Sequence, residues 1–345
     1  MRFCKQYFVF IFPGLLLAAC FFSACEPTII KPLAISGIQG NRVAVLCEGN
    51  FMWNNARLDI YHPDSNINWA NAYEQVNKKP LGDVLQNGVL YANTLYLSIN
   101  NSGKVLGINP KTLQQTKINA HLKSPRFILP VGRHLWITDL YSNTISVLDT
   151  ASLSLEKELL VDAYTEQLVK WNQFVAVASY NGKVLLFDPN SFMLKHTIYT
   201  DTGSMFLAVD ASSSLWVVSS AVGKSSMQKF SVSDFSRTRY FNAEKKSFGK
   251  IELSLDGRDL FFLYQNAIWR MPVSAVSLAE ASVFYRGPKL IYGFNLNPRD
   301  SCLYIADAKD YVSNGEVSVV NAKSGALMQR FATGVNPSFF VPLQP

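Results

Sequence analysis

Charged residues are scarce in this 345-residue chain, at 17%, whereas hydrophobic residues make up 48% and aromatic residues 13%. So large an apolar fraction excludes a disordered chain. The low charge and the near absence of helical periodicity favour an aromatic-rich β protein over a charged helical one. The net charge is +7, yet no basic tail or stripe is present. We therefore expect no nucleic-acid partner.

Motifs of enzyme chemistry are also missing. The sequence has no Gly-x-Ser-x-Gly elbow and no phosphate-binding glycine loop. Its histidines form no short metal-ligand spacing, and it has no Asp-x-Asp-x-Asp cluster for calcium. We expect a protein that is not an enzyme and that holds no metal or cofactor. A pair of carboxylates brought together from distant loops remains open.

The first residues resemble an export signal. Arg2 and Lys5 precede an apolar run that is short for a membrane span and lacks a stop-transfer flank. Two tetrapeptides, ending at Cys20 and Cys25, resemble the lipobox of bacterial lipoproteins. We favour Cys25, because a polar segment starts directly after it; plain secretion is the alternative.

These features predict the domain organisation. We expect a lipoprotein signal peptide at residues 1–24, a lipid-anchored tether at 25–40 and one folded domain at 41–345. The acylated Cys25 would hold the protein on the lipid bilayer, since two lipid signals already anchor a protein stably. We expect an outer-membrane protein, exposed at the cell surface.

The body of the chain repeats. A short β run recurs at spacings of 39–45 residues, and a related run lies upstream at Val43. The recurrent runs begin at Leu95, Leu135, Phe174, Leu215, Leu260 and Leu303. In each unit the recurrent run is followed by a polar loop, a second β run, an Asp, Asn or Pro turn and a more polar strand. A further apolar strand precedes the recurrent run. Four short strands in about 40 residues are typical of a propeller blade.

The two ends of the folded domain complement each other. The first unit lacks an opening strand, whereas the C-terminal segment 338–342 reads like one. We therefore predict an all-β, seven-bladed β-propeller with four strands per blade, in which residues 338–342 pair beside residues 43–47 and close the ring. Cys47 would lie at the end of one strand and Cys302 at the start of the equivalent strand. These ends are roughly 17 Å apart, so we expect no disulfide between them.

The repeat, with its leucine-tyrosine strand, asparagine-rich turn and valine-rich strand, resembles the YVTN-type (YncE-like) propeller repeat over residues 41–342. Two stretches, Cys47–Phe51 followed by Asn54–Ala56, and Leu81–Val84, are similar to BtuG-type surface lipoproteins of Bacteroidetes. The sequence departs from that pattern at Cys47 and at the inserted Met52 and Trp53. The resemblance implies capture of cobalamin and a TonB-dependent outer-membrane transporter as partner.

The candidate ligand-binding residues lie in loops that a propeller gathers on one end of the ring. Aromatic side chains there give rigid contact area, and amides give directed hydrogen bonds. Apolar residues 51–53 form either a contact surface or a contact with the long 63–80 insertion. Arg126 either contacts a ligand or pairs with Asp83 or Asp139. The predicted site comprises Trp53, Asn54, Asp83, Gln86, Arg126, Tyr141 and Tyr180.

We thus expect a monomeric, non-enzymatic propeller that captures cobalamin, a related corrinoid or another small ligand. Two alternatives remain. An adaptor for a protein or glycan would have a flat polar face, and a propeller hydrolase or lactonase would need acids or metal ligands clustered in the channel.

Overall fold

The computed structural model describes residues 40–243, 247–287 and 289–343. The predicted signal peptide (1–24), the lipidation site Cys25 and nearly all of the predicted tether lie outside these residues. Among the described residues, no helix has the length and apolar character needed to cross a membrane.

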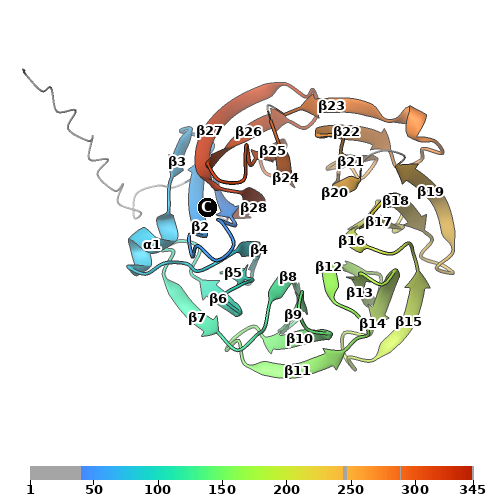
Figure 1. Ribbon diagram of the computed structural model, residues 1–345, viewed down its shortest axis with the longest axis horizontal. Coiled ribbons are helices and arrows are strands. Elements are labelled where there is room, and N and C mark those ends of the chain that lie inside the picture. Colours follow the sequence, from blue (N-terminus) through green and yellow to red (C-terminus); the bar gives the residue numbers. More distant parts are fainter. Residues whose placement is uncertain (1–39, 244–246, 288, 344–345) are drawn as a thin grey trace, which may run out of the picture. The chain divides into compact units, whose positions relative to one another are not determined.

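Seven four-stranded antiparallel sheets form a ring (Figure 1). Each sheet is one blade, with its first strand beside the central axis and its last strand on the outside. The first blade comprises β28 (Pro337–Leu343), β1 (Arg42–Cys47), β2 (Arg57–His62) and β3 (Ile67–Trp69). The second comprises β4 (Leu85–Tyr91), β5 (Thr94–Ile99), β6 (Lys104–Ile108) and β7 (Gln115–Asn119). The third comprises β8 (Pro125–Val131), β9 (His134–Asp139), β10 (Thr144–Asp149) and β11 (Leu155–Leu160).

The remaining blades follow in chain order. The fourth comprises β12 (Thr165–Trp171), β13 (Phe174–Ser179), β14 (Lys183–Phe187) and β15 (Leu194–Tyr199). The fifth comprises β16 (Ser204–Val209), β17 (Leu215–Ala221), β18 (Lys224–Phe230) and β19 (Arg237–Ala243). The sixth comprises β20 (Phe248–Leu253), β21 (Asp259–Tyr264), β22 (Ala267–Pro272) and β23 (Ser282–Arg286). The seventh comprises β24 (Ile291–Asn297), β25 (Cys302–Asp307), β26 (Asn314–Asn321) and β27 (Leu327–Val335).

The predicted ring closure is confirmed. β28 pairs antiparallel with β1, with Val43 opposite Pro342 and Leu46 opposite Phe339. The last strand of the chain thereby becomes the innermost strand of the first blade, and the largest open edge of the propeller disappears. Cys47 and Cys302 are both free and buried, as predicted.

The core lies between neighbouring blades. The second strand of each blade is apolar on both sides, because it is covered by the blades before and after it; β1 and β25, for example, are buried at every residue. The outer strands are more polar, as in β11, where five of six residues are exposed. This gradient explains why the sequence has apolar second strands and polar fourth strands.

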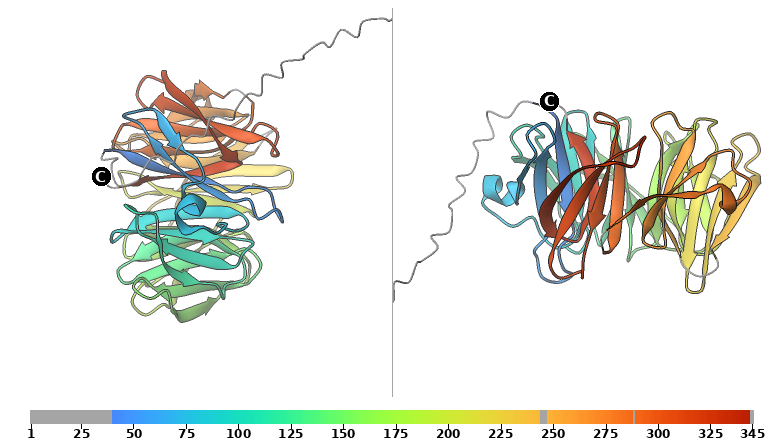
Figure 2. Two further views of the ribbon diagram at one scale, coloured as in Figure 1. Left: turned by 90° about the vertical axis from the view of Figure 1, so that its left-hand side faces the viewer. Right: turned by 90° about the horizontal axis from the view of Figure 1, so that it is seen from above.

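The 63–80 insertion is part of the folded core. It forms β3 and the short helix α1 (Ala72–Asn77) on the outer side of the first blade (Figure 2). Tyr73 of α1 is fully buried, and its hydroxyl donates to Gln115 Oε1 of the second blade at 2.7 Å. The insertion therefore fastens the first blade to the second.

Candidate functional site

The site lies at one end of the ring. At this end the first strand of each blade begins and the second strand ends, as shown by the pairings Leu85 with Ile99 and Ile291 with Asp307. We call it the mouth face. The loops that carry the predicted site residues all lie on it.

Every innermost strand is irregular near its start. The pairing register shifts after the first residue of each strand, so that the second residue has no partner in the neighbouring strand. Such bulges redirect a side chain and are common beside functional sites. Here they place one residue per blade around the channel mouth: Gln86, Arg126, Glu166, Met205, Gly249, Tyr292 and Ser338.

These positions surround a cavity of about 320 Å³, which we call the upper chamber. Six of the seven bulge residues line it, together with Glu48 and Lys250. Phe127, Phe206 and Phe339 line it as well, and two of these, Phe127 and Phe339, also line a second cavity of about 490 Å³ further along the channel. Phe127 and Phe339 therefore lie between the upper chamber and the lower part of the channel.

Arg126 is held on both sides. Its Nη1 donates to Gln86 Oε1 at 2.7 Å, and its Nε and Nη2 donate to Glu166 Oε2 at 3.0 and 2.7 Å. The ion pair joins the third blade to the fourth. From the sequence, Asp83 and Asp139 were the possible partners of Arg126 in a blade-to-blade ion pair. Such a pair is present, but its carboxylate belongs to Glu166, so both expected partners were wrong.

The carboxylates of the channel have perturbed acidity. Burial raises the pKa of Glu166, and the adjacent Arg126 guanidinium opposes this shift. Burial likewise raises the pKa of Glu48, against the hydrogen bond donated by the Tyr292 hydroxyl to Glu48 Oε2 at 2.7 Å. Perturbed groups in a cavity are a mark of functional sites.

Lys250 is the second cation of the channel. Its ammonium lies 3.3 Å from Glu252 Oε1 and 4.0 Å from the centre of the Phe339 ring. Burial lowers the pKa of Lys250 to about 8, although Glu252 acts in the opposite direction. Apart from this ion pair, the ammonium has no hydrogen-bond partner among the described residues.

Apolar side chains project from the rim of the mouth face. Phe51, Met52 and Trp53, in the loop between β1 and β2, are exposed by 57%, 77% and 68%. This exposure favours the contact surface over packing against the 63–80 insertion, the two alternatives that the sequence left open. The loop is fixed: Met52 N donates to Asp83 Oδ2 at 2.8 Å, and Asn50 Nδ2 donates to the Tyr311 carbonyl oxygen at 2.7 Å.

The backbone of this loop is also unusual. Met52 and Asn54 have φ angles of 68° and 53°, in the left-handed region that most residues avoid. Such conformations persist only where surrounding contacts enforce them, and they concentrate at functional sites.

Two tyrosine pairs stand at the rim. Tyr164 and Tyr180 stack with ring centres 4.5 Å apart, and Tyr292 meets Tyr311 edge-on at 5.7 Å. Tyr164 lies two residues before Glu166 on the chain entering the fourth blade, whereas the Tyr292 hydroxyl donates to Glu48. Each pair thus connects the exposed rim with a carboxylate of the channel.

The structure brings only some of the predicted residues together. Gln86 and Arg126 are bonded to each other, and Asp83 holds the loop that carries Trp53 and Asn54. Tyr141, in the loop between β9 and β10, is exposed by 69%, and its backbone N donates to Asp139 Oδ1 at 2.9 Å. Tyr180 joins the site through Tyr164.

Lys250, Glu252, Tyr292 and the phenyl rings were missed from the sequence. All but Glu252 had a positional signal. Tyr292 is the second residue of its opening strand, whereas Lys250 and the three phenylalanines are the third residues of theirs. Aligning the opening strands would have shown this. The irregular register was not visible from periodicity, which expects strict alternation.

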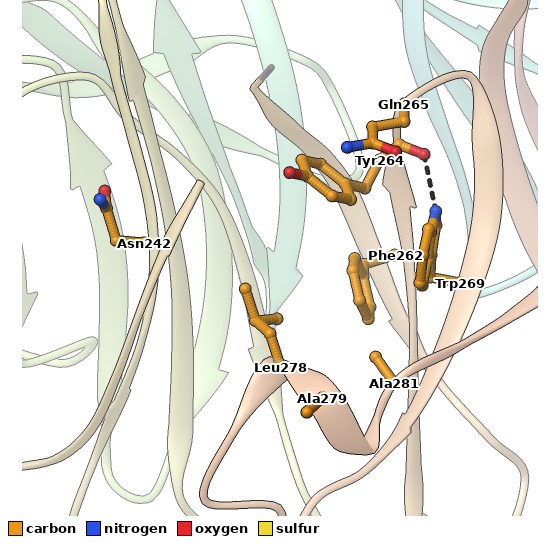
Figure 3. Close-up of a pocket in the computed structure, with 8 residues that line it drawn as sticks. All are labelled: Asn242, Phe262, Tyr264, Gln265, Trp269, Leu278, Ala279 and Ala281. Atoms are coloured by element: carbon orange, nitrogen blue, oxygen red, sulfur yellow. Dashed lines mark hydrogen bonds between the residues drawn. The ribbon is translucent and has the colours of Figure 1, made fainter. Parts of the chain in front are cut away.

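Another hollow lies outside the channel, between the fifth and sixth blades. Its volume is about 430 Å³, and Phe262, Tyr264 and Trp269 form one wall (Figure 3). In Figure 3 Leu278 faces Phe262 across the hollow, and the Asn242 side chain lies apart on β19. None of its lining residues is charged, so we place the candidate site in the channel. Among the described residues, no group of three or more His, Cys, Asp or Glu could hold a metal ion.

Comparisons with known proteins agree with the fold. None of the curated proteins matches the sequence. A quinoprotein alcohol dehydrogenase-like protein from Bacteroides thetaiotaomicron is 13% identical, with a TM-score of 0.68 over 86% of this chain and 77% of that one. The periplasmic gluconolactonase of Pseudomonas aeruginosa is 13% identical, with a TM-score of 0.67 over 88% of this chain and 99% of that one.

A putative 6-phosphogluconolactonase from Bacteroides uniformis is 15% identical, with a TM-score of 0.65 over 88% of this chain and all of that one. At such low identity these similarities concern the propeller fold alone. Residues 43–239, more than half of the chain, match a family described as a domain of unknown function, DUF5074. The chain therefore belongs to the DUF5074 family, and it folds as a seven-bladed β-propeller.

Proposed function

We propose that this chain is a non-enzymatic binding protein that holds its ligand on the mouth face, and that the ligand is cobalamin or a related corrinoid. The observation that carries the proposal is the fixed, exposed loop of Phe51, Met52 and Trp53. Three large apolar side chains held in the open beside a polar cavity are typical of a contact surface.

The two stretches that resemble corrinoid-binding lipoproteins also meet on this face. Ala56 N donates to the Gly82 carbonyl oxygen at 3.1 Å, and Met52 N donates to Asp83. Segments about 30 residues apart thus form one surface. This proximity supports a shared role for them.

The size of the upper chamber favours a ligand that lies across the face. At about 320 Å³ it is at the lower limit of small-molecule pockets, so a broad macrocycle must rest on the rim. There it would meet the Tyr164–Tyr180 pair, the Tyr292–Tyr311 pair and Trp53. Because the rim is fixed by hydrogen bonds, little ordering is required on binding.

The proposal extends to the cell envelope. β1 enters the ring at the face opposite the mouth, since Arg42 pairs with Leu343 at the far end of β28. We include in the proposal a lipid anchor at Cys25 and a TonB-dependent transporter as partner.

Calorimetric titration of the full-length protein with cyanocobalamin, and with cobinamide in parallel, tests the proposal. We expect saturable binding that Trp53→Ala weakens at least tenfold. Trp269→Phe, in the hollow outside the channel, is the matched control and should bind as the wild type does. If neither corrinoid binds, or if Trp53→Ala binds unchanged, the proposal is wrong and an adaptor for a protein or glycan replaces it.

A further inference from the structure

The upper chamber is a built site of its own, distinct from the exposed rim. It is lined by residues of six of the seven blades, and three of these residues, Glu48, Arg126 and Lys250, are ionisable. A ligand spread across the rim would not fill the chamber below it, so the charged lining of the chamber needs a separate role.

Both cations of the channel are already paired with a carboxylate. Arg126 pairs with Glu166 at 2.7 Å, and Lys250 pairs with Glu252 at 3.3 Å. A strongly anionic ligand would face Glu48 and both paired carboxylates, whereas a cationic ligand would face Arg126 and Lys250. Bringing an unpaired charge into such a site is costly, so the chamber favours a neutral ligand.

The same groups have hydrogen-bonding capacity left over. Lys250 is only 8% exposed, and its Nζ makes no hydrogen bond among the described residues. An ammonium has three donors, and only one can point toward Glu252. Glu48 also lines the chamber, and the Tyr292 hydroxyl donates to its Oε2 at 2.7 Å. A carboxylate has about four lone-pair sites, so Glu48 can also accept from a ligand.

Apart from Gln86, Tyr292 and Ser338, the rest of the lining is apolar. Phe127, Phe206 and Phe339 form the inner wall, and Met205 and Leu263 complete it. A suitable ligand thus needs one apolar face for the rings, and several neutral groups that both donate and accept hydrogen bonds. Alternating hydroxyl groups on a small saturated ring satisfy both conditions.

We propose that the upper chamber binds a neutral polyhydroxylated molecule of monosaccharide size, with Lys250 donating to its hydroxyl oxygens and Glu48 accepting from its hydroxyl protons. Hydrogen bonds to charged groups are the stronger kind, which gives the ligand its orientation. The inference does not depend on corrinoid binding at the rim.

Saturation-transfer NMR and calorimetry of the full-length protein test it, with D-glucose, D-galactose, N-acetyl-D-glucosamine and myo-inositol as probes. We expect saturable binding of at least one probe and about a tenfold loss of affinity in Lys250→Met, because one charge-assisted hydrogen bond is removed. Lys229→Met is the matched control: Lys229 is a comparably buried lysine paired with Asp210 at 2.8 Å, away from the channel. Thermal unfolding of both variants establishes that each is folded.

Two results would overturn the proposal: no saturable binding of any of the four probes, or equal affinities in the wild type and Lys250→Met. The rim proposal is separable from it. Trp53→Ala should leave sugar binding unchanged, whereas Lys250→Met should leave corrinoid binding unchanged.

Discussion

The backbone N–H of Met52 donates to Oδ2 of Asp83 at 2.8 Å, and so joins a loop of the first blade to the chain entering the second. The same carboxylate oxygen accepts from Asn101 Nδ2 at 2.5 Å. One buried aspartate thus positions two loops of the mouth face. It holds the apolar loop in an exposed conformation in which Met52 has a left-handed φ of 68°.

Replacing Asp83 should loosen this loop without unfolding the propeller. We expect Asp83→Ala to weaken corrinoid affinity about tenfold, because the free loop must be ordered again on binding. The free energy of unfolding should fall by less than about 1.5 kcal/mol, since the exposed Met52 N–H regains water. Calorimetry and urea unfolding measure the two effects. Asp188→Ala, which removes a similar turn aspartate on the opposite face, should leave affinity unchanged; an equal loss in both would contradict the assignment.

The Arg126–Glu166 pair should matter to stability more than any exposed ion pair of the ring. Arg126→Met leaves the Glu166 carboxylate, whose side chain is 5% exposed, without its cation. Breaking a buried pair in this way costs about 3–5 kcal/mol. Urea unfolding followed by tryptophan fluorescence gives the value.

The double variant Arg126→Met with Glu166→Gln should recover most of this loss, because the buried charge is gone. Arg133→Ala is the control: this side chain is 67% exposed and pairs with Glu156, so about 1 kcal/mol or less is expected. A double variant no more stable than Arg126→Met would show that the pair is not the source of the effect.

The architecture could be predicted from the sequence because each blade repeats the same requirements. The second strand is covered on both sides and must be apolar, as in β25, and the turns need Asp, Asn or Pro. These are local demands, so recurring runs such as those at Leu95 and Leu303 reveal the blades. Ring closure could be predicted because the first blade lacks an opening strand in the N-terminal part of the sequence, whereas the C-terminal segment 338–342 supplies one.

The chamber could not be predicted in the same way. Lys250 and Tyr292 lie 42 residues apart in sequence and share a cavity only because the ring brings their strands together. Neither belongs to a local motif. Arg126 and its partner Glu166 lie 40 residues apart, whereas Asp139, one of the two partners considered from the sequence, lies only 13 residues from Arg126.

Ring closure places Gly293 of β24 directly against β28. A Cβ atom at this position would overlap the Ser338 carbonyl oxygen. We expect Gly293→Ala to lower the free energy of unfolding by about 1–3 kcal/mol, the usual cost of overpacking. In Gly107→Ala the new atom would meet the side chains of Lys117 and Thr94 at 3.2–3.3 Å, which can shift. Thermal unfolding of the two variants compares them, and equal melting temperatures would argue against a tight seam at Gly293.

The thiol of Cys47 should be inert until the ring opens. Cys47 is fully buried, and burial together with nearby Asp59 raises the pKa of its thiol to about 12. Because the thiolate is the reactive form, we expect no alkylation of the Cys47 peptide by iodoacetamide at pH 8 in the native protein. Complete alkylation should follow in urea. Mass spectrometry of the digested protein distinguishes this peptide from the others, and rapid native labelling would mean that the β1–β28 seam opens readily.

Lys250 should leave a signature in the pH dependence of stability. Burial lowers its pKa from 10.5 to about 8, so between these values the unfolded chain binds more protons than the folded chain. Below pH 8 Lys250 is charged in both states, and the cost of burying its charge lowers the free energy of unfolding in full. Between pH 8 and 10.5 the folded protein loses this proton first, so the destabilising effect diminishes as the pH rises. The buried thiols act in the opposite direction, because the pKa values of Cys47 and Cys302 are raised, but they are common to the wild type and to Lys250→Met.

We expect the stability of the wild type minus that of Lys250→Met to increase from pH 8 to pH 10, measured by urea unfolding at each pH. Two parallel pH profiles would show that the ammonium of Lys250 is well solvated in the channel, and the chamber would then lack the buried donor on which its proposed ligand depends.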